Sequence, residues 1–300
     1  MGTRIFLGLT LIGVLAGIFI LDHAFGRPWG FAILCAIAGV LALKEGSRLV
    51  RARGLDIDWV VLVASQIAML CFLFFGFPHM DDGKAADSAR SSALLVHTAV
   101  TVVTVSLLLP LAVAARAIAR ALWDPNVSRI GDLFSGTLTL HFYISVPVAI
   151  MLGLRMFPGV GEWLVIWLIA VCRLGSDSCA YFAGKALGRH KLIPYVSPGK
   201  TFEGLIGGMV GSVAVGAALW WMIEGLRVWH GLWVIMGLSL AVGIVAAFGD
   251  LLESALKRGA AVKDSGAVLP AFGGVLDVID GFLLAVPATF VFVLIESLRG

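Results

Sequence analysis

Nine apolar runs, each close to the length of a membrane span, follow one another through this chain of 300 residues. A transmembrane helix needs about 20 mostly apolar residues, and backbone exposed to lipid must form its hydrogen bonds within helices or closed barrels. Only 14% of the residues are charged, whereas an average soluble protein has about 25%. We therefore predict an all-α, polytopic integral membrane helix bundle of about nine transmembrane helices. The predicted spans are 5–21, 28–43, 57–77, 93–114, 134–153, 161–176, 205–223, 231–249 and 275–296.

The polar segments between these runs are too short to form a separate water-soluble domain. We predict a single membrane domain, 1–300, in which 1–160 holds N-terminal spans and 161–300 holds catalytic spans and cytoplasmic loops. The first run lacks a clear small-x-small cleavage site, so we interpret it as a retained helix rather than a signal peptide. The cysteines form no C-x-x-C pair and the histidines no H-x-x-x-H pair, which argues against a zinc site.

The basic residues indicate the orientation, because lysines and arginines are enriched in cytoplasmic loops. With a cytoplasmic N-terminus, sixteen of the 22 Lys and Arg residues fall on the cytoplasmic side. This orientation places the polar loops 173–204 and 250–274 in the cytoplasm, where soluble nucleotides are found. We expect a multi-pass protein of the cell inner (cytoplasmic) membrane, with a cytoplasmic N-terminus, cytoplasmic catalytic loops and no nucleic-acid partner.

Small residues recur at four-residue spacing along the predicted span 205–223. Such faces let helix backbones approach each other closely. We favour packing within one chain, and a homodimer seam is the alternative. The residues are Gly204, Gly208, Ser212 and Gly216, with Gly207 and Gly211 as a second pair.

Two polar motifs interrupt the apolar background of the second half. The first, Ser176–Tyr181, contains Asp177, for which a metal ligand and a helix cap with Ser176 and Ser178 are equally good interpretations. The second, Ser197–Gly204, offers hydroxyls, Lys200 and backbone N–H groups at a helix start, which are the groups that hold phosphate. It lacks the first glycine of a P-loop, so plain helix capping is an open alternative.

A third polar motif, Gly249–Asp280, begins with a predicted helical face. Asp250, Glu253, Ser254 and Lys257 recur at i, i+3, i+4 and i+7 and therefore share one side of a helix. A break rich in glycine and proline follows this face.

The same motif ends in two carboxylates, Asp277 and Asp280, one helical turn apart in an apolar run. Carboxylates at membrane depth are unfavourable unless positive charge lies between them. We favour a divalent metal, and the alternative is a buried ion pair with Lys257, Arg258 or Lys263. Carboxylates, basic residues and glycine turns together suggest phosphate chemistry with Mg²⁺.

No Ser-His-Asp set, nucleophile elbow or redox-cofactor fingerprint is present in the sequence. Phosphoryl or nucleotidyl transfer needs little covalent help from a protein, because metal, positive charge and positioning suffice.

The run S-x-x-K-R-x-x-x-x-K-D-x-G-x-x-x-P-x-x-G-G-x-x-D-x-x-D, Ser254 to Asp280, resembles the signature of the phosphatidate cytidylyltransferases, or CDP-diacylglycerol synthases. The upstream motifs DSCAYFAGKALGRHK, SPGKTFEG and GDLLES also resemble family motifs, in the family's order and spacing. These motifs cover about 120 residues, and the first 170 residues match only as a string of spans.

The resemblance implies an enzyme that joins CTP and the membrane lipid phosphatidate and requires Mg²⁺. A phosphate oxygen of the lipid attacks the α-phosphorus of CTP, giving CDP-diacylglycerol and pyrophosphate. Family carboxylates bind metal, which implies Asp250, Asp277 and Asp280 as metal ligands. The catalytic candidates are Asp250, Lys257, Arg258, Lys263, Asp264, Asp277 and Asp280. The substrate-binding candidates are Asp177, Ser197, Lys200, Thr201, Glu203, Glu253, Ser254, Gly273 and Gly274.

Two residues depart from the family pattern. Phe272 replaces a frequent histidine, and Val278 replaces a frequent arginine between the paired aspartates. We expect the activity to be kept, since both aspartates are present; an altered substrate preference or a weakly active paralogue is the alternative.

Two other functions compete with this prediction. One is a related lipid-phosphate nucleotidyltransferase with another lipid substrate. The other is a membrane transporter or flippase, whose ion path also uses paired intramembrane carboxylates. The phosphate-binding motif Ser197–Gly204 favours the enzyme over the transporter.

Overall fold

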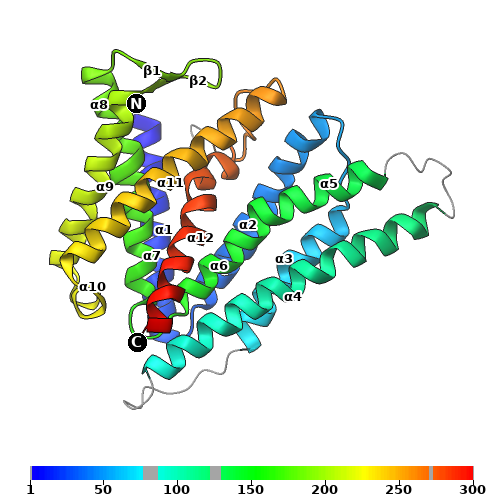
Figure 1. Cartoon of the computed structure of the whole chain (residues 1–300), viewed down its shortest axis with the longest axis horizontal. Coiled ribbons are helices and arrows are strands. Elements are labelled where there is room, and N and C mark those ends of the chain that lie inside the picture. The colour runs from blue at the N-terminus through cyan, green and yellow to red at the C-terminus, as the bar shows by residue number, and fades with distance from the viewer. Residues whose placement is uncertain (1, 77–86, 122–129, 270–272, 300) are drawn as a thin grey trace. The chain divides into compact units, whose positions relative to one another are not determined.

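The computed structural model describes residues 2–76, 87–121, 130–269 and 273–299, and helices account for most of them (Figure 1). Within this described part, eight helices are long and apolar enough to span a membrane, and Thr10–Phe25 is a shorter apolar helix. Each of the nine predicted spans coincides with one of these helices. The chain is a multi-pass membrane protein of all-α architecture.

The chain divides into two compact units. The expectation of a single membrane domain stays a prediction. The first unit comprises Met1–Ala85, Ala93–Gly153 and Gly259–Val278. The second comprises Ala86–Ser92, Leu154–Arg258 and Ile279–Gly300.

In the first unit, carboxylates cap the N-termini of two helices. Asp22 accepts hydrogen bonds from the N–H groups of Gly30 (2.6 Å) and Phe31 (3.1 Å) at the start of α2. Asp58 accepts a hydrogen bond from the Val61 N–H (3.2 Å) at the start of α3 and forms an ion pair with Arg116. The helices are α1 (Gly2–Phe25), α2 (Trp29–Ala52), α3 (Trp59–Gly76), α4 (Asp87–Ala121), α5 (Ile130–Leu140), the π-helix η2 (His141–Ser145) and α6 (Val146–Arg155).

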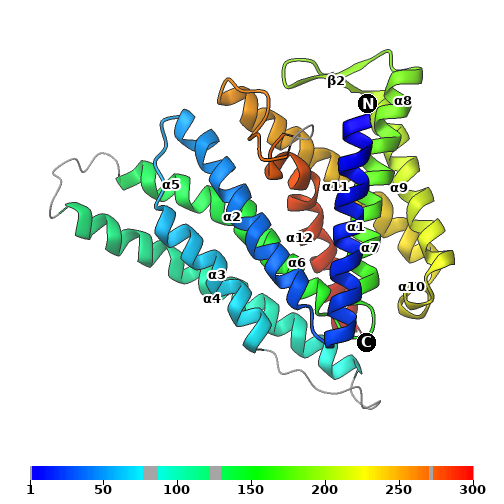
Figure 2. The same cartoon turned by 180° about the vertical axis from the view of Figure 1, so that it is seen from behind.

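Apolar side chains of α3, α4 and α5 form a core cluster in the first unit, where these helices lie together (Figure 2). Burying each valine or leucine of this cluster contributes about 1.5–3 kcal/mol where water is the alternative. The cluster consists of Val61, Leu109, Val113, Ala117 and Leu133.

The second unit combines one long helix, a β-hairpin and four further helices. The long helix runs without a break through α7 (Gly161–Ala170), the π-helix η3 (Val171–Ser178) and α8 (Cys179–Leu187). A two-stranded antiparallel sheet follows (Figure 1). In its register, Lys191 lies opposite Thr201. The remaining elements are β1 (Lys191–Ile193), β2 (Ser197–Thr201), α9 (Phe202–Met222), α10 (Glu224–Trp229), α11 (Leu232–Gly259) and α12 (Val275–Arg299).

Two helices of the second unit extend further than the predicted spans. The predicted span 161–176 continues to Leu187, and the predicted span 231–249 continues to Gly259. Asp177 therefore lies inside a continuous helix and does not cap one. The predicted helical face from Asp250 to Lys257 is confirmed, because α11 includes both residues.

The small residues of α9 pack against neighbouring helices of the same chain. A Cβ at Gly208 would lie 2.8 Å from the Ser176 carbonyl oxygen. A Cβ at Gly211 would collide with Cys179 and lie 2.7 Å from the Gly175 carbonyl oxygen. Packing within one chain thus occupies this face, and a homodimer stays a prediction.

We expect Gly211→Ala to lower the stability of the second unit. The added methyl group overfills a tight helix contact, which costs about 1–3 kcal/mol. Thermal unfolding of the detergent-solubilised protein should show a lower midpoint. Gly237→Ala is the control, because a Cβ there would meet nothing within 4 Å. Equal midpoints for the two variants would contradict the packing argument.

Candidate active site

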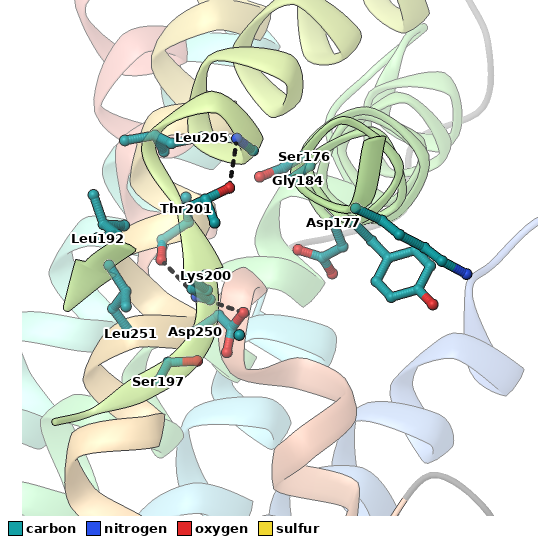
Figure 3. A pocket seen from close by; sticks show the side chains of 16 residues that line it. Ser176, Asp177, Gly184, Leu192, Ser197, Lys200, Thr201, Leu205, Asp250 and Leu251 are labelled. Carbon is teal, nitrogen blue, oxygen red and sulfur yellow. Dashed lines mark hydrogen bonds and ion pairs between the residues drawn. The ribbon is translucent and has the colours of Figure 1, made fainter. Parts of the chain in front are cut away.

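A cavity of about 380 Å³ in the second unit brings the separate polar motifs together (Figure 3). Its walls come from η3, α8, the β-hairpin, the start of α9, and α11. Predicted site residues that line it are Asp177, Ser197, Lys200, Thr201 and Asp250. Residues more than 70 positions apart in the sequence therefore share one pocket.

Lys200 and Asp250 form an ion pair within this pocket. The Lys200 Nζ lies 2.7 Å from the Asp250 Oδ2, and the two side chains point toward each other in Figure 3. Lys200 comes from β2 and Asp250 from α11, so the pair joins the motifs SPGKTFEG and GDLLES. Both side chains keep about a quarter to a third of their surface exposed (26% and 32%), so both are accessible to a ligand.

Thr201 and Glu203 hold the start of α9 in place. The Thr201 hydroxyl accepts the Gly204 N–H (3.0 Å), which caps the helix. Glu203 accepts the N–H groups of Arg189 (3.1 Å) and His190 (3.2 Å) and lies 2.6 Å from the His190 Nδ1. The capping alternative is therefore confirmed for Thr201, while Lys200 remains directed into the pocket.

Three carboxylates gather beside the pocket. Asp250, Glu253 and Asp280 each offer an oxygen, and these oxygens lie within 4.8 Å of one another. Glu253 is fully buried and Asp280 is 5% exposed. Buried carboxylates this close need positive charge among them.

Protein cations supply part of that charge. The Lys257 Nζ lies 2.5 Å from Glu253, one turn earlier on α11. The Arg173 guanidinium bonds Asp177 (2.5 Å) and approaches Asp280 (3.6 Å). Both interpretations of the acidic residues, metal ligands and ion-pair partners, thus find support in the same cluster.

The backbones of α11 and α12 meet at glycine next to this cluster. A Cβ at Gly249 would lie 2.7 Å from the Asp280 carbonyl oxygen and 3.2 Å from the Gly281 Cα. The absence of a side chain lets the two helices touch, which brings Asp250 and Asp280 to within metal-binding distance.

The loop before α12 belongs to the first unit and holds the rest of the signature. The Asp277 Oδ2 accepts three hydrogen bonds, from the Ser265 N–H (3.0 Å), the Ser265 hydroxyl (2.8 Å) and the Gly274 N–H (2.7 Å). Gly273 has φ +92°, a conformation that favours glycine, and a Cβ at Gly274 would collide with Ser265 and Glu45. The backbone conformation therefore favours glycine at 273, and the close approach of the Ser265 and Glu45 side chains favours it at 274.

The sequence matches the model of the Cytidylyltransferase family over residues 2–296. The chain belongs to this family.

Two curated relatives of this chain illustrate its similarity within the cytidylyltransferase family, and both are named phosphatidate cytidylyltransferase. The relative from Staphylococcus aureus (strain COL) is 39% identical over 125 residues, which cover 42% of this chain and 44% of the relative. The relative from Chlamydia trachomatis serovar D is 34% identical over 184 residues, covering 57% of this chain and 59% of the relative. The chain thus spans about half the length of the curated relatives it matches.

The predicted site residues fall in both units. The second unit holds Asp177, Ser197, Lys200, Thr201, Glu203, Asp250, Glu253, Ser254, Lys257, Arg258 and Asp280, and the first unit holds Lys263, Asp264, Gly273, Gly274 and Asp277.

Several predicted site residues do not line the pocket. Ser254 lies 3.5 Å from Asp250 on the same helix, and the Arg258 Nε donates to the Val196 carbonyl in the hairpin (3.3 Å). Lys263 and Asp264 are exposed. Of the two departures from the family pattern, Val278 lies on α12 between the aspartates, and Phe272 lies outside the described residues.

Sequence reasoning missed Arg173 and Glu45. A lone arginine in an apolar run, four residues before Asp177, was the signal for Arg173. Glu45 lies on α2 and is 1% exposed, and its partners are backbone N–H groups some 230 positions away. No sequence pattern points to such partners.

Proposed function

We propose that this family member is a phosphatidate cytidylyltransferase, an enzyme that transfers CMP from CTP to phosphatidate. The products are CDP-diacylglycerol and pyrophosphate, in phospholipid biosynthesis. The observation that carries the proposal is the pocket in which Lys200 of SPGKTFEG meets Asp250 of GDLLES beside a buried carboxylate cluster. The names of the curated relatives support the same activity.

The chemistry requires positioning more than acid–base catalysis. A phosphate oxygen of phosphatidate forms a bond to the α-phosphorus of CTP, and the bond from that phosphorus to the bridging oxygen breaks. Pyrophosphate leaves with the electron pair. The attacking oxygen is already ionised at neutral pH, so the protein needs no general base. Lys200 supplies positive charge inside the pocket, where triphosphate charge would otherwise be poorly solvated.

Mg²⁺ is the proposed cofactor. Asp250, Glu253 and Asp280 fit it, because carboxylate oxygens are the ligands that Mg²⁺ prefers and these oxygens lie within 4.8 Å of one another. When bound, Mg²⁺ neutralises phosphate charge and polarises the phosphorus centre. Asp277, one turn before Asp280 on α12, stays a predicted further ligand.

The proposed location is the cell inner membrane, with the N-terminus and the catalytic loops in the cytoplasm. The uneven distribution of basic residues and the bacterial sources of the relatives support it. Phosphatidate then reaches the site from the cytoplasmic leaflet, and CTP from the cytosol.

A direct assay tests the proposed function. The purified full-length protein in detergent is incubated with phosphatidate, Mg²⁺ and α-³²P-labelled CTP, and the lipid fraction is analysed. Labelled CDP-diacylglycerol is expected. Label that appears only with a different lipid phosphate would assign the related transferase instead. No labelled lipid with any lipid phosphate would reject both enzymes, and uptake or lipid scrambling in liposomes would then favour a transporter.

We expect Lys200→Met to lower kcat/KM for CTP by about a hundredfold, because a charged contact to the phosphates is lost. Initial rates at varied CTP concentration measure the effect. Lys185→Met is the matched control: it removes one positive charge from the same pocket without breaking the Asp250 ion pair. We expect a loss of less than about threefold there, since an exposed charge is well screened. Equal losses would show that only the total charge of the pocket matters.

A further inference from the structure

The N-terminus of α12 is capped by a side chain from a distant helix. The first N–H groups of a helix have no partner within it. Here the Val275 N–H donates to the Glu45 Oε1 (3.1 Å) and the Leu276 N–H to the Glu45 Oε2 (2.8 Å). The Ser265 hydroxyl also donates to the Glu45 Oε2 (3.3 Å). The Glu45 carboxylate on α2 thus accepts three hydrogen bonds, two from the first turn of α12 and one from Ser265 before it.

The contact between Glu45 and this segment is tight as well as polar. Glu45 is 1% exposed, and a Cβ at Gly266 or at Gly274 would collide with its carboxylate. A buried carboxylate is unfavourable unless hydrogen bonds satisfy it, and the positive end of a helix dipole adds to the stabilisation. Glu45 therefore fits this one place, and the two glycines make room for it.

Glu45 shares one donor, the Ser265 hydroxyl, with Asp277. The Ser265 hydroxyl lies within hydrogen-bonding distance of both carboxylates, 3.3 Å from Glu45 and 2.8 Å from Asp277. The Gly274 N–H, the one immediately before the two that Glu45 receives, donates to Asp277 (2.7 Å). The cap thus fixes both the axial position and the rotation of the first turn of α12.

We propose that Glu45 is a positioning residue of the active site. It acts indirectly, by setting where α12 begins. Asp277 and Asp280 lie on the first two turns of this helix, so a shift of its start displaces both carboxylates. Displacements of about 1 Å at a catalytic group lower rates by as much as about a hundredfold. One test of this inference measures enzyme activity and so rests on the proposed function. The other measures metal binding and does not depend on it.

The test compares Glu45→Gln with Asp22→Asn. Glutamine keeps the size of the side chain but points an NH₂ group at a backbone N–H donor. Asp22 is the matched control, because it is equally buried (2% exposed) and caps α2 through two backbone N–H groups. The helix that Asp22 caps also carries Glu45, but the capped N–H groups of Gly30 and Phe31 lie about four turns before Glu45, so loss of this cap leaves the contacts of Glu45 in place.

Two readouts are measured on the full-length protein below its unfolding temperature. Mn²⁺ binding is followed by the loss of the free-ion EPR signal, and the Mg²⁺ dependence of CDP-lipid formation is measured in parallel. For Glu45→Gln we expect the Mn²⁺ Kd and the apparent Mg²⁺ constant to rise about tenfold, the size seen when groups supporting metal ligands are lost. For Asp22→Asn we expect less than about a twofold change, whatever it does to stability.

Each outcome decides the proposal. Unchanged metal constants in Glu45→Gln, or equal rises in both variants, would overturn it, because a general loss of stability would then explain the effect. If Glu45→Gln does not fold, Ser265→Ala replaces it. That variant removes only the shared hydroxyl and should raise the Mn²⁺ Kd about threefold; no rise would overturn the proposal. If the wild type makes no CDP-lipid while Glu45→Gln still weakens Mn²⁺ binding, the proposed function fails and the positioning role stands.

Discussion

Replacing Asp280 by asparagine is expected to lower kcat for CDP-lipid formation by about a thousandfold or more. Asp280 provides one of three clustered carboxylate oxygens and is 5% exposed. Asparagine has the same shape but no charge, so the proposed metal site would lose one of its ligands. A metal contributes several kcal/mol of transition-state stabilisation, and about 4 kcal/mol corresponds to a thousandfold in rate. Labelled CDP-lipid from saturating substrates gives kcat.

Glu224→Gln is the control for this variant. Glu224 lies on α10 in the same unit and is exposed, so the same loss of charge there should change kcat by less than about twofold. Thermal unfolding of both variants shows whether the Asp280 variant is folded, since Arg173 loses part of its partner charge. A folded Asp280→Asn protein with wild-type kcat would remove Asp280 from the proposed catalytic set.

Removing divalent metal with EDTA is expected to reduce product formation to background, and added Mg²⁺ should restore it. The cluster offers hard oxygen ligands from Asp250, Glu253 and Asp280, which suit Mg²⁺. Ca²⁺ should restore little activity, because it prefers six to eight ligands at longer distances. The measurement is labelled CDP-lipid at constant free CTP.

The helical content of the EDTA-treated protein, followed by circular dichroism, serves as the control here. It should stay unchanged, because the described structure of the second unit is held by helix packing and ion pairs such as Lys257–Glu253. Activity that persists after complete chelation would reject the metal role of these carboxylates. Loss of helix together with activity would instead point to a structural metal.

The order and approximate extent of the membrane helices could be predicted from the sequence. Apolar runs of span length have few alternatives in lipid, so each predicted span became a helix. The ends were less predictable. Asp177 looked like the end of a span, yet the helix continues to Leu187, and Arg173 pairs with that carboxylate inside it.

The candidate site was predictable as a set of motifs but not as a geometry. Periodicity placed Asp250 and Glu253 on one helical face, and α11 confirms the helix. The pairing of Lys200 with Asp250 depends on how a hairpin returns to α11, and no periodicity encodes that path. The role of Glu45 could not be predicted for a different reason. Its carboxylate accepts hydrogen bonds from backbone N–H groups, which every residue except proline has.

The π-helical segment η3, Val171–Ser178, carries a consequence for comparing relatives. Its hydrogen bonds run from residue i to i+5, so it holds more residues per turn than an α-helix of the same course. Arg173 and Asp177 both lie within this wider turn. A relative that straightens the helix would carry a one-residue deletion there, and every residue before the gap would rotate by about 100° relative to those after it. Alignment gaps between positions 171 and 178 would therefore mark relatives in which this ion pair is rebuilt.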